Sequence, residues 1–552
     1  MTTLASVALA PAADKAGWTL AAALRAAARH RPDQIAVRTT RGETLTYADM
    51  LARVESLAAG LLALGVRPGD RIVLMMDNSI EMLLTWFAVN VAGAVEVPSN
   101  TAHRGRSLAH VLAQCGAAVA VIDSRYADVL SEIRSDVPDL RTVVVNGPPT
   151  DLPWPCHDLR SVPRDGDRDR VAAPTATYRD PAAIIYTSGT TGPAKGVVVP
   201  HGHMYTFARH VAEQLRLTSD DVYYVCLPLF HANAQFMQVY ASVLAAGTVV
   251  LAERFSAGNW VREVHECGAT VSSLLGVMAQ FLFNQPPSGL DTRHSLRRMI
   301  TIPLPAAIAE EFERRFAVTC VEAYGMTEVC LPLYRRLDEP LRPGSCGRPL
   351  DDWFEVAIVD PETDEPLPDG EIGEIVVRPC RPFTTFSGYH AMPERTVDAW
   401  RNLWFHTGDA GRRDSDGYYY FVDRLKDRIR RRGENISAYD VEVALTELPD
   451  VLDVAVVATP ASEGEDDIKA FLVVAEPAAF DPVAILRHCA ERLPYFAVPR
   501  YLELVPELPR TANGKVLKRE LRARADSGGQ WDRERAGWTV RRGTAGVVRT
   551  RP

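Results

Sequence analysis

The sequence predicts an α/β protein: a large N-terminal domain of parallel-sheet subdomains with a distorted β-barrel, then a small α+β C-terminal domain. With 552 residues the chain is too long for a single hydrophobic core. Helical and extended apolar patterns alternate from Trp18 to about Arg424, which is typical of parallel sheets covered by helices. After Arg424 the pattern changes to short strands with few helices. We therefore expect a large domain at 18–424, a small domain at 425–525 and a flexible tail at 526–552.

The individual elements follow this alternation. Helical apolar spacing marks TYADMLARVESLAAGLLALG, which ends at Gly65, and a buried strand follows at RIVLMM. A second helix at SIEMLLTWFAVNVAG precedes the short strand AVEVP. Further along, the strands FEVAIVD and EIGEIVV flank PETDEPLPDG, whose Pro, Asp and Gly residues predict a β-hairpin or a barrel edge. The small domain should contain the helix SAYDVEVALTEL, the strands DVAVVAT and KAFLVVA, a helix from Pro482 and a last strand RYLELV.

Composition argues against several classes of protein. A net charge of -9 leaves no basic footprint for nucleic acid, and the Arg-rich stretch after Arg519 is interrupted by acids, as in a solvated tail. The 9 cysteines are scattered without a C-x-x-C pair, which fits reduced thiols better than disulfides or a zinc site. The most apolar stretch, from Met82, contains Asn90 and Glu96 and is too short to span a bilayer. The N-terminal MTTLASVALAPAADK lacks the basic region of a signal peptide. We expect a cytoplasmic protein that binds neither nucleic acid nor membrane.

The stretch YTSGTTGPAKG, from Tyr186 to Gly196, has the composition of a phosphate-binding loop. It departs from the G-x-x-x-x-G-K-[ST] pattern, because Ala194 occupies the second glycine slot and Gly196 follows Lys195. Buried strands precede and follow it, at AAIIYT and GVVVPHG. Small hydroxyl residues interleaved with glycine can turn N–H and hydroxyl groups toward an anion, and the lysine adds positive charge. An ordinary hairpin loop is the alternative. The other loop residues are Thr187, Ser188, Gly189, Thr190, Thr191 and Gly192.

Four further stretches carry groups suited to a nucleotide. In EAYGMTE, Glu328 could hold Mg²⁺ and Tyr324 offers a flat face to a base. In WFHTGD, Asp409 could accept hydrogen bonds from ribose hydroxyls, although an Asx-type turn is the simpler explanation in isolation. The charged stretch VDRLKDRIRRRGENIS spans the predicted domain boundary, and a solvated face is its ordinary explanation. In PRTANGKVLKREL, the Asn-Gly turn presents Lys515, for which an exposed surface lysine is the alternative.

Together and in this order, the five stretches resemble the adenylate-forming superfamily of acyl- and aryl-CoA synthetases, peptide-synthetase adenylation domains and beetle luciferases. The resemblance extends from about Trp18 to Leu521, and the part from RPGSCGRPL through GENIS is most similar to carnitine/crotonobetaine-CoA ligases. It implies an ATP- and Mg²⁺-dependent ligase that converts a small-molecule carboxylic acid into an acyl- or aryl-AMP and pyrophosphate. The acyl group then passes to CoA. A mobile small domain and a homodimer are further expectations from the family.

The resemblance also implies roles for single residues. The loop from Thr187 to Lys195 would surround the β- and γ-phosphates, and Thr327 would contact the α-phosphate. Glu328 would bind Mg²⁺, while Tyr324 with Gly325 would contact adenine.

The remaining matched residues belong to the ribose site and the small domain. Asp409 would hold the ribose hydroxyls, with Arg424 nearby. Lys515 would bridge the carboxylate and the α-phosphate, Lys426 would be the hinge, and Gly433 would line the pantetheine tunnel.

Two departures from the family pattern concern the acid. A Gly-Gly-Ala-Pro-like turn is usual where this chain has TIPLPAA, 301–307, so the pocket wall should be bulkier. Amino-acid-activating domains carry Asp after the residue matching Phe230, whereas this chain has His231, which argues against an α-amino acid. His231 would orient the substrate carboxylate, and a core histidine is the alternative. Five residues are predicted to line a pocket for an aryl or medium-sized acyl group, with plain core as the alternative: Asn233, Phe236, Gly276, Val277 and Met278.

The acceptor and the acid remain open at this point. Some superfamily members of bacterial secondary metabolism activate nitrite with AMP and transfer it to an aryl amine, giving a diazo group. The nucleotide motifs of such a diazotase would be the same, and a small closed acid pocket would favour it. A carrier protein as acceptor and a luciferase-like oxygenation are further alternatives. The CoA ligase is preferred because the basic loop around Gly433 is present.

Overall fold

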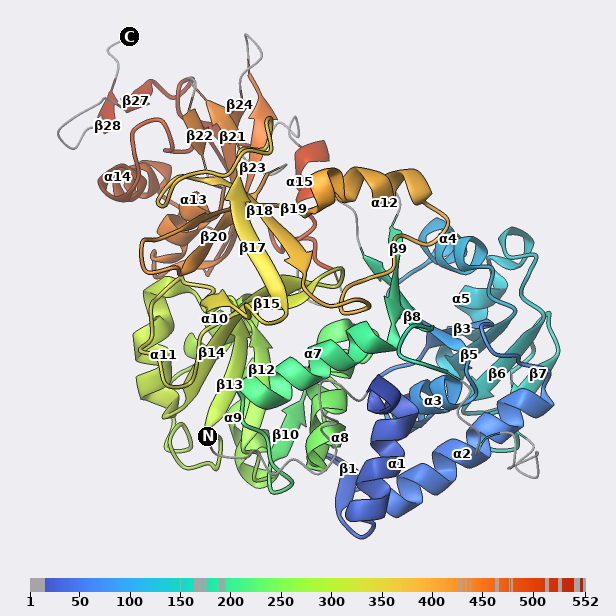
Figure 1. The fold of residues 1–552 in the computed structure, drawn as a ribbon. Coiled ribbons are helices and arrows are strands. Elements are labelled where there is room, and N and C mark those ends of the chain that lie inside the picture. Colours follow the sequence, from blue (N-terminus) through green and yellow to red (C-terminus); the bar gives the residue numbers. More distant parts are fainter. Residues whose placement is uncertain are drawn as a thin grey trace. The chain divides into compact units, whose positions relative to one another are not determined.

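The computed structural model describes most of the chain (Figure 1). The chain folds into two compact units. Unit 1 contains the described residues up to 357, with 376–406 and 416–419, and unit 2 contains 358–375, 407–415 and the described residues from 420 onward. The residues described are 15–148, 150–162, 171, 176–187, 194–425, 429–431, 434–436, 438–461, 466–475, 477, 480–511, 516–524, 529–540 and 547–549.

Unit 1 begins with a 7-stranded sheet in the order β7-β6-β5-β3-β4-β8-β9. Its strands pair in parallel except β8 with β9, which are antiparallel. The bounds are β3 (Arg71–Met75), β4 (Val95–Pro98), β5 (Val119–Asp123), β6 (Thr142–Asn146), β7 (Cys156–Asp158), β8 (Pro181–Thr187) and β9 (Lys195–Pro200). The predicted strands on both sides of the phosphate loop are therefore confirmed as β8 and β9.

A 9-stranded sheet completes unit 1, in the order β16-β15-β14-β13-β12-β10-β11-β1-β2. Neighbours from β14 to β1 pair in parallel. The bounds are β1 (Ile35–Thr39), β2 (Thr44–Thr46), β10 (Val222–Val225), β11 (Thr248–Leu251), β12 (Val271–Leu275), β13 (Arg298–Ile302), β14 (Thr319–Met326), β15 (Cys330–Tyr334) and β16 (Arg348–Pro349).

Helices of unit 1 begin and end at the residues that the sequence marks. In α2 (Tyr47–Ala63), the Thr46 hydroxyl caps the first turn by accepting from the Asp49 N–H at 3.1 Å. The chain leaves this helix at Gly65 with φ of 90°. In α3 (Ile80–Val91) every residue except Glu81 is buried, and the helix packs against β1 of one sheet and β3 and β4 of the other. Its largely apolar sequence is thus explained by burial on most of its circumference. Within the described part of the chain, no helix has the length and apolarity needed to cross a bilayer.

Other helices and strands complete the fold. Four strands form the sheet β17-β18-β19-β20, in the region predicted as a barrel edge. Unit 2 also holds the sheet β23-β24-β25-β26 and the antiparallel pairs β21-β22 and β27-β28. The predicted α/β class with a smaller α+β part is confirmed, while the exact domain boundaries stay predictions. The bounds are α1 (Leu20–His30), α7 (His201–Gln214), α9 (Ala257–Glu266), α10 (Gly276–Phe283), α13 (Ala438–Thr446), α14 (Pro482–Arg492), α15 (Lys518–Ala523), β17 (Phe354–Val359), β18 (Gly373–Pro379), β19 (Phe405–Arg413), β20 (Tyr419–Arg424), β21 (Ile429–Arg431), β22 (Glu434–Ile436), β23 (Val451–Pro460), β24 (Asp466–Val474), β25 (Tyr501–Leu504), β26 (Trp531–Asp532), β27 (Trp538–Val540) and β28 (Val547–Arg549).

A buried carboxyl group connects β4 to the π-helix η4 (Asn233–Tyr240). Glu96 is 0% exposed, and the Gln235 amide donates to its Oε2 at 3.0 Å. Burial raises the pKa of Glu96 well above its ordinary value, and the hydrogen bond from Gln235 offsets only part of this effect. Glu96 therefore favours its protonated form more than an exposed glutamate does, and its hydrogen bond with Gln235 joins the two elements.

We predict that Glu96→Gln changes the pH dependence of stability. Because the folded-state pKa is raised, the unfolded chain loses its proton first as pH rises above 4.5, and wild-type stability then falls. The glutamine variant lacks this titration, so its Tm should gain on the wild type progressively as pH rises from about 5 toward the raised folded-state pKa of Glu96. Thermal unfolding at several pH values measures the difference. Glu43→Gln, at an exposed position, is the control. A constant Tm difference across this range would show that Glu96 is charged in the fold.

Candidate functional site

The predicted acid and adenine residues of unit 1 follow the carboxyl ends of neighbouring strands. The segment after β10 carries His231, Gly276 follows β12, Pro303 follows β13, and Tyr324 lies at the end of β14. Because β10, β12, β13 and β14 are adjacent and parallel, their carboxyl ends meet at one edge of the sheet. Ligands of open parallel sheets bind outside this edge, so the fold gathers these residues where a substrate would bind.

A π-helix follows His231 at this edge. His231 is half-buried, its ring lies 4.6 Å from that of Phe230, and its carbonyl accepts from the Gln235 N–H at 3.1 Å. Asn233 starts η4 and accepts from the Gln238 amide at 2.8 Å. Phe236 is fully buried in the hydrophobic core, which favours the core alternative for this residue. π-Helical turns are rare and concentrate at functional sites.

The bulky wall at 301–307 presses on the start of α10. A Cβ on Gly276 would lie 2.4 Å from the Pro303 carbonyl oxygen, so no larger residue fits there without a backbone shift. Leu304 is 1% exposed and fills the space behind. Val277 and Met278 pack against the same core, Val277 partly buried and Met278 buried. The wall therefore leaves little space at the carboxyl ends of β12 and β13, where Gly276 and Pro303 lie.

A tight hairpin presents Thr327 and Glu328. Strands β14 and β15 are antiparallel, Met326 pairs with Cys330, and Tyr324 at the strand end is 6% exposed. A Cβ on Gly325 would lie 2.0 Å from the Cys330 carbonyl oxygen and 2.8 Å from the Leu331 Cα. Only glycine therefore allows the two strands to approach this closely.

A carboxyl group behind this hairpin is held neutral. Glu322 on β14 is 1% exposed, and burial raises its pKa to about 8 although Arg335 favours the charged form. It is paired in register with Thr301 of the wall. Glu322 thus holds its proton at higher pH than an exposed glutamate does.

Tyr389 connects the phosphate loop to the predicted magnesium ligand. Its hydroxyl donates to Glu328 Oε1 at 3.0 Å, and the Lys195 ammonium lies 4.6 Å from the centre of its ring. Backbone bonds fix this geometry, because the His390 N–H donates to the Gly196 carbonyl at 2.7 Å and the Phe386 N–H to the Glu328 carbonyl at 2.9 Å. The sequence analysis did not identify Tyr389. The stretch FSGYH has no periodicity, and only its Gly-Tyr turn composition marks it.

The predicted ribose ligand lies in unit 2. Asp409 on β19 is 3% exposed, and its Oδ1 lies 3.1 Å from the Arg424 Nε on β20. The preceding Gly408 donates its N–H to the Glu374 carboxylate at 2.8 Å. The predicted proximity of Asp409 and Arg424 therefore exists in the structure, while the ribose role stays a prediction.

Eight predicted residues lie outside the described part of the chain, and their roles stay predictions. They are Ser188, Gly189, Thr190, Thr191, Gly192, Lys426, Gly433 and Lys515. The described Thr187 and Lys195 face each other across the β8–β9 pair.

The donor set at Glu328 suits Mg²⁺ bound together with phosphates. Among the described residues no group of three or more His, Cys, Asp or Glu side chains could hold a metal by itself. Mg²⁺ at phosphate sites commonly takes one or two carboxylates and completes its shell with phosphate oxygens and water. A single buried carboxylate near a lysine fits that pattern.

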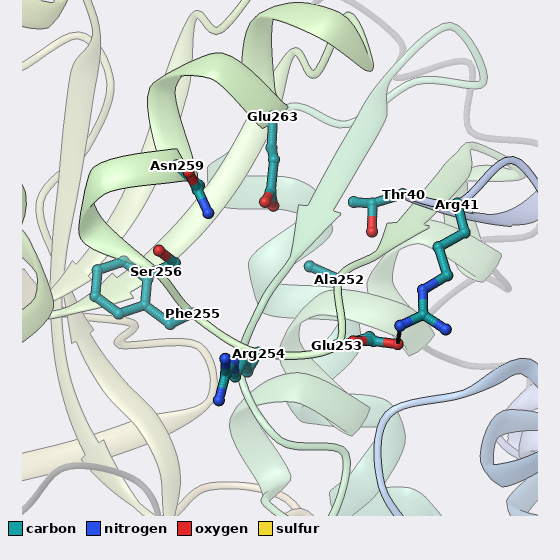
Figure 2. A pocket seen from close by; sticks show the side chains of 9 residues that line it. All are labelled: Thr40, Arg41, Ala252, Glu253, Arg254, Phe255, Ser256, Asn259 and Glu263. Atoms are coloured by element: carbon teal, nitrogen blue, oxygen red, sulfur yellow. Dashed lines mark ion pairs between the residues drawn. The ribbon is translucent and has the colours of Figure 1, made fainter.

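A separate polar cavity of about 370 Å³ lies at the carboxyl ends of β1 and β11 (Figure 2). None of the predicted site residues lines it. Three of its charged groups have partners, since Arg41 pairs with Glu253 and Glu263 accepts from the Tyr224 hydroxyl at 2.5 Å. Its lining is Thr40, Arg41, Ala252, Glu253, Arg254, Phe255, Ser256, Asn259 and Glu263.

Comparisons with known proteins identify relatives over most of the chain. Residues 24–390 match the AMP-binding enzyme family, and 440–515 match the AMP-binding enzyme C-terminal domain. Crotonobetaine/carnitine–CoA ligases of Escherichia coli and Salmonella typhimurium are 32% identical, over 86% of this chain and 93% of theirs.

Solved structures of ligases have a fold similar to that of this chain. ATP-bound MatB from Rhodopseudomonas palustris has a TM-score of 0.83 at 28% identity, covering 92% of this chain and 99% of that one. The anthranilate CoA ligase AuaEII in complex with anthranoyl-AMP has a TM-score of 0.84 at 25% identity, covering 92% and 98%.

We predict that Gly325→Ala disrupts the hairpin that presents Thr327 and Glu328. The new methyl group must displace the β15 backbone, which should cost about 1–3 kcal/mol of stability and lower ATP-dependent pyrophosphate release at least about tenfold. Gly289→Ala, where a Cβ meets nothing within 4 Å, should leave both unchanged. Wild-type Tm and activity in the Gly325 variant would contradict the close approach of the two strands.

We predict that Tyr389→Phe weakens the contribution of Glu328 while keeping the ring beside Lys195. Loss of a hydrogen bond to a charged group should lower pyrophosphate release about tenfold or more and raise the Mg²⁺ concentration for half-maximal rate. Tyr420→Phe removes a Tyr–Asp hydrogen bond of 3.0 Å in unit 2 and serves as the control. An unchanged Mg²⁺ dependence in the Tyr389 variant would show that its hydroxyl does not support Glu328.

Proposed function

Because the chain belongs to the AMP-binding enzyme family, we propose that it uses ATP and Mg²⁺ to adenylate a carboxylic acid and then transfers the acyl group to CoA. The single observation that carries the proposal is the cluster of Lys195, Tyr389 and Glu328, which joins the end of the phosphate loop to a buried carboxylate. An AMP-forming ligase of the acid–CoA type is the activity of the relatives over most of this chain.

In the first half-reaction a carboxylate oxygen of the acid attacks the α-phosphorus of ATP, and the bond to the departing pyrophosphate breaks. Lys195 and the loop before it bind the β- and γ-phosphates, and Thr327 orients the α-phosphate. Glu328 would hold Mg²⁺, which would supply positive charge to the phosphate oxygens. Tyr389 keeps that carboxylate oriented, and a loop that guides a leaving pyrophosphate needs no hydroxyl after Lys195.

Lys515 supplies the remaining positive charge for adenylation. Two anions must meet in this step, and a fixed cation in a desolvated site lowers that barrier strongly. In the second half-reaction the CoA thiolate attacks the acyl carbon, AMP departs, and Gly433 leaves room for the pantetheine arm. Asp409 holds the ribose in this scheme, and Lys426 is the hinge between the two half-reactions.

The acid is an aryl or medium-sized acyl carboxylate in our proposal. His231 orients its carboxylate, and the sheet edge at Gly276 and Pro303 limits its size. Anthranilate and crotonobetaine, named for two of the relatives, are the first acids to test. The reported comparisons name carboxylic acids and give no support to the nitrite-activating alternative, toward which the bulky wall at 301–307 points only faintly.

A cytoplasmic location and a homodimer belong to the same proposal. The 9 cysteines are all free thiols, as a reducing compartment would keep them. A place in secondary metabolism stays a prediction.

Pyrophosphate release with a panel of acids, nitrite included, tests the function, with mass detection of products after CoA or an aryl amine is added. We expect at least one carboxylic acid to give a CoA thioester. Release of pyrophosphate with nitrite and an aryl amine alone, without thioester from any acid, would overturn the proposal.

We predict that Lys515→Ala lowers adenylation by about 3 kcal/mol or more, which is at least about 100-fold. Transfer from preformed acyl-adenylate to CoA should change much less, because Lys515 acts where ATP and the carboxylate meet. Single-turnover measurements of the two half-reactions separate these effects, and Arg519→Ala, at an exposed position, is the control. Equal losses in both half-reactions would contradict this role.

A further inference from the structure

The chain continues beyond residue 515, where the match to the C-terminal domain family ends, and this continuation is built into unit 2. We call the described residues 529–540 and 547–549 the C-terminal extension. Its strand β26 pairs antiparallel with β25, with Asp532 opposite Tyr501 and Trp531 opposite Leu502. Trp531 also packs against the hydrophobic core of unit 2. The stretch 526–552, where we expected a flexible tail, thus contains an edge strand of the main sheet of unit 2.

Two arginines of unit 2 share one buried carboxylate next to this strand. Asp467 Oδ1 lies 2.8 Å from Arg431 Nη2, and Asp467 Oδ2 lies 2.7 Å from Arg500 Nη1. Arg431 is 5% exposed and Asp467 is 4% exposed. One negative charge for two guanidinium groups leaves an uncompensated positive charge in a poorly solvated place, which is costly.

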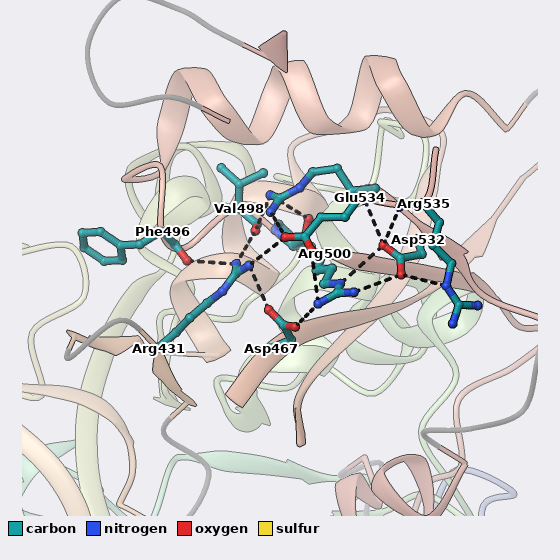
Figure 3. Close-up of polar contacts among 10 residues, drawn as sticks. Arg431, Asp467, Phe496, Val498, Arg500, Asp532, Glu534 and Arg535 are labelled. Atoms are coloured by element: carbon teal, nitrogen blue, oxygen red, sulfur yellow. Dashed lines mark hydrogen bonds and ion pairs between the residues drawn. The ribbon is translucent and has the colours of Figure 1, made fainter. Parts of the chain in front are cut away.

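The C-terminal extension supplies acids to both arginines (Figure 3). It also brings a buried arginine of its own: Arg533 is 4% exposed, and its Nη2 lies 3.6 Å from Glu534 Oε1. Asp532 Oδ2 lies 3.3 Å from Arg500 Nη2, and Glu534 Oε2 lies 3.3 Å from Arg500 Nη1. The other oxygen of Glu534 lies 4.0 Å from Arg431 Nη2. Burial alone would raise the pKa of Asp532, but hydrogen bonds from Arg500 and from the Glu534 and Arg535 N–H groups hold it below its ordinary value. Asp532, Arg533 and Glu534 thus join Arg431, Asp467 and Arg500 in one ion-pair cluster, and these three residues lie beyond the match to the C-terminal domain family.

Arg431 connects these ion pairs to hairpin β21–β22, which precedes and follows the proposed pantetheine residue in the sequence. It ends β21, pairs in register with Glu434 of β22, and donates to the Phe496 and Val498 carbonyls at 3.3 Å each. Gly433, the proposed pantetheine residue, follows β21 in the sequence and lies outside the described part of the chain. The contacts of Arg431 therefore hold the described base of this hairpin.

We propose that the C-terminal extension is a positioning element for acyl transfer to CoA: Asp532 and Glu534 hold Arg500 and Arg431, and thereby fix the base of hairpin β21–β22. This inference rests on the proposed CoA ligase function. Neither acid contacts substrate in this scheme. Glu534 acts on Arg431 directly, and Asp532 acts on it through Arg500 and Asp467.

The test uses the full chain with Asp532→Asn and Glu534→Gln combined. Adenylation is measured as pyrophosphate release without CoA, and transfer as thioester formation from preformed acyl-adenylate at several CoA concentrations. We expect adenylation within about twofold of wild type and a KM for CoA raised about tenfold or more. Glu507→Gln, an exposed acid of the same unit, should change neither step. Glu534→Asp, which keeps the charge, should recover most of the CoA affinity lost in Glu534→Gln.

Each outcome separates the two proposals. A wild-type protein that forms adenylate but never a thioester overturns the CoA function and this inference with it. A wild type that completes both steps, with a double variant that loses neither step or loses both equally, overturns only the positioning role. If the double variant unfolds below the assay temperature, Glu534→Gln alone decides the question. It keeps the Asp532–Arg500 pair, and a selective rise in KM for CoA supports the inference while its absence overturns it.

Discussion

Burial of two helices between two parallel sheets is the constraint on which unit 1 depends. Helix α3 packs on strands of both sheets, and α7 packs on β8 and β9 of one and β15 of the other. Because α7 starts directly after β9, the strands that flank the phosphate loop are anchored to this shared layer. Burial lowers the pKa of His201 to about 4 and those of His203 and His210 to about 3, so the layer holds imidazoles in their neutral form.

This shared layer explains how distant motifs meet. The loop motif ends at β9 in one sheet, and the hairpin with Glu328 belongs to the other sheet. A third segment, around Tyr389, pairs with β9 through the Val197–Tyr389 bridge and bonds to the Glu328 backbone. The two halves of the predicted phosphate site are therefore joined by main-chain bonds.

Local patterns predicted what local physics determines. The sequence predicted the capped helix that ends at Gly65, the strands around the phosphate loop and the order of the motifs, because periodicity and turn chemistry are short-range signals. It did not predict Tyr389 as a site residue, since the partners of Tyr389, Glu328 and Lys195, lie far away in the sequence. The C-terminal extension shows another limit. Mixed arginines and acids are equally compatible with a solvated tail and with a paired cluster, and only the location of Asp467 and Arg500 distinguishes the two cases.

The contact between Gly276 and Pro303 has an evolutionary consequence. A side chain added at position 276 would meet the main-chain carbonyl oxygen of residue 303, which every residue at position 303 carries. A substitution at position 303 therefore cannot by itself admit a larger residue at position 276. Divergence at this point would require a shift of the wall backbone, as an insertion or deletion within residues 301–307 would produce. A directed-evolution library that varies the length of the wall would reach variants that point substitutions at position 276 never reach.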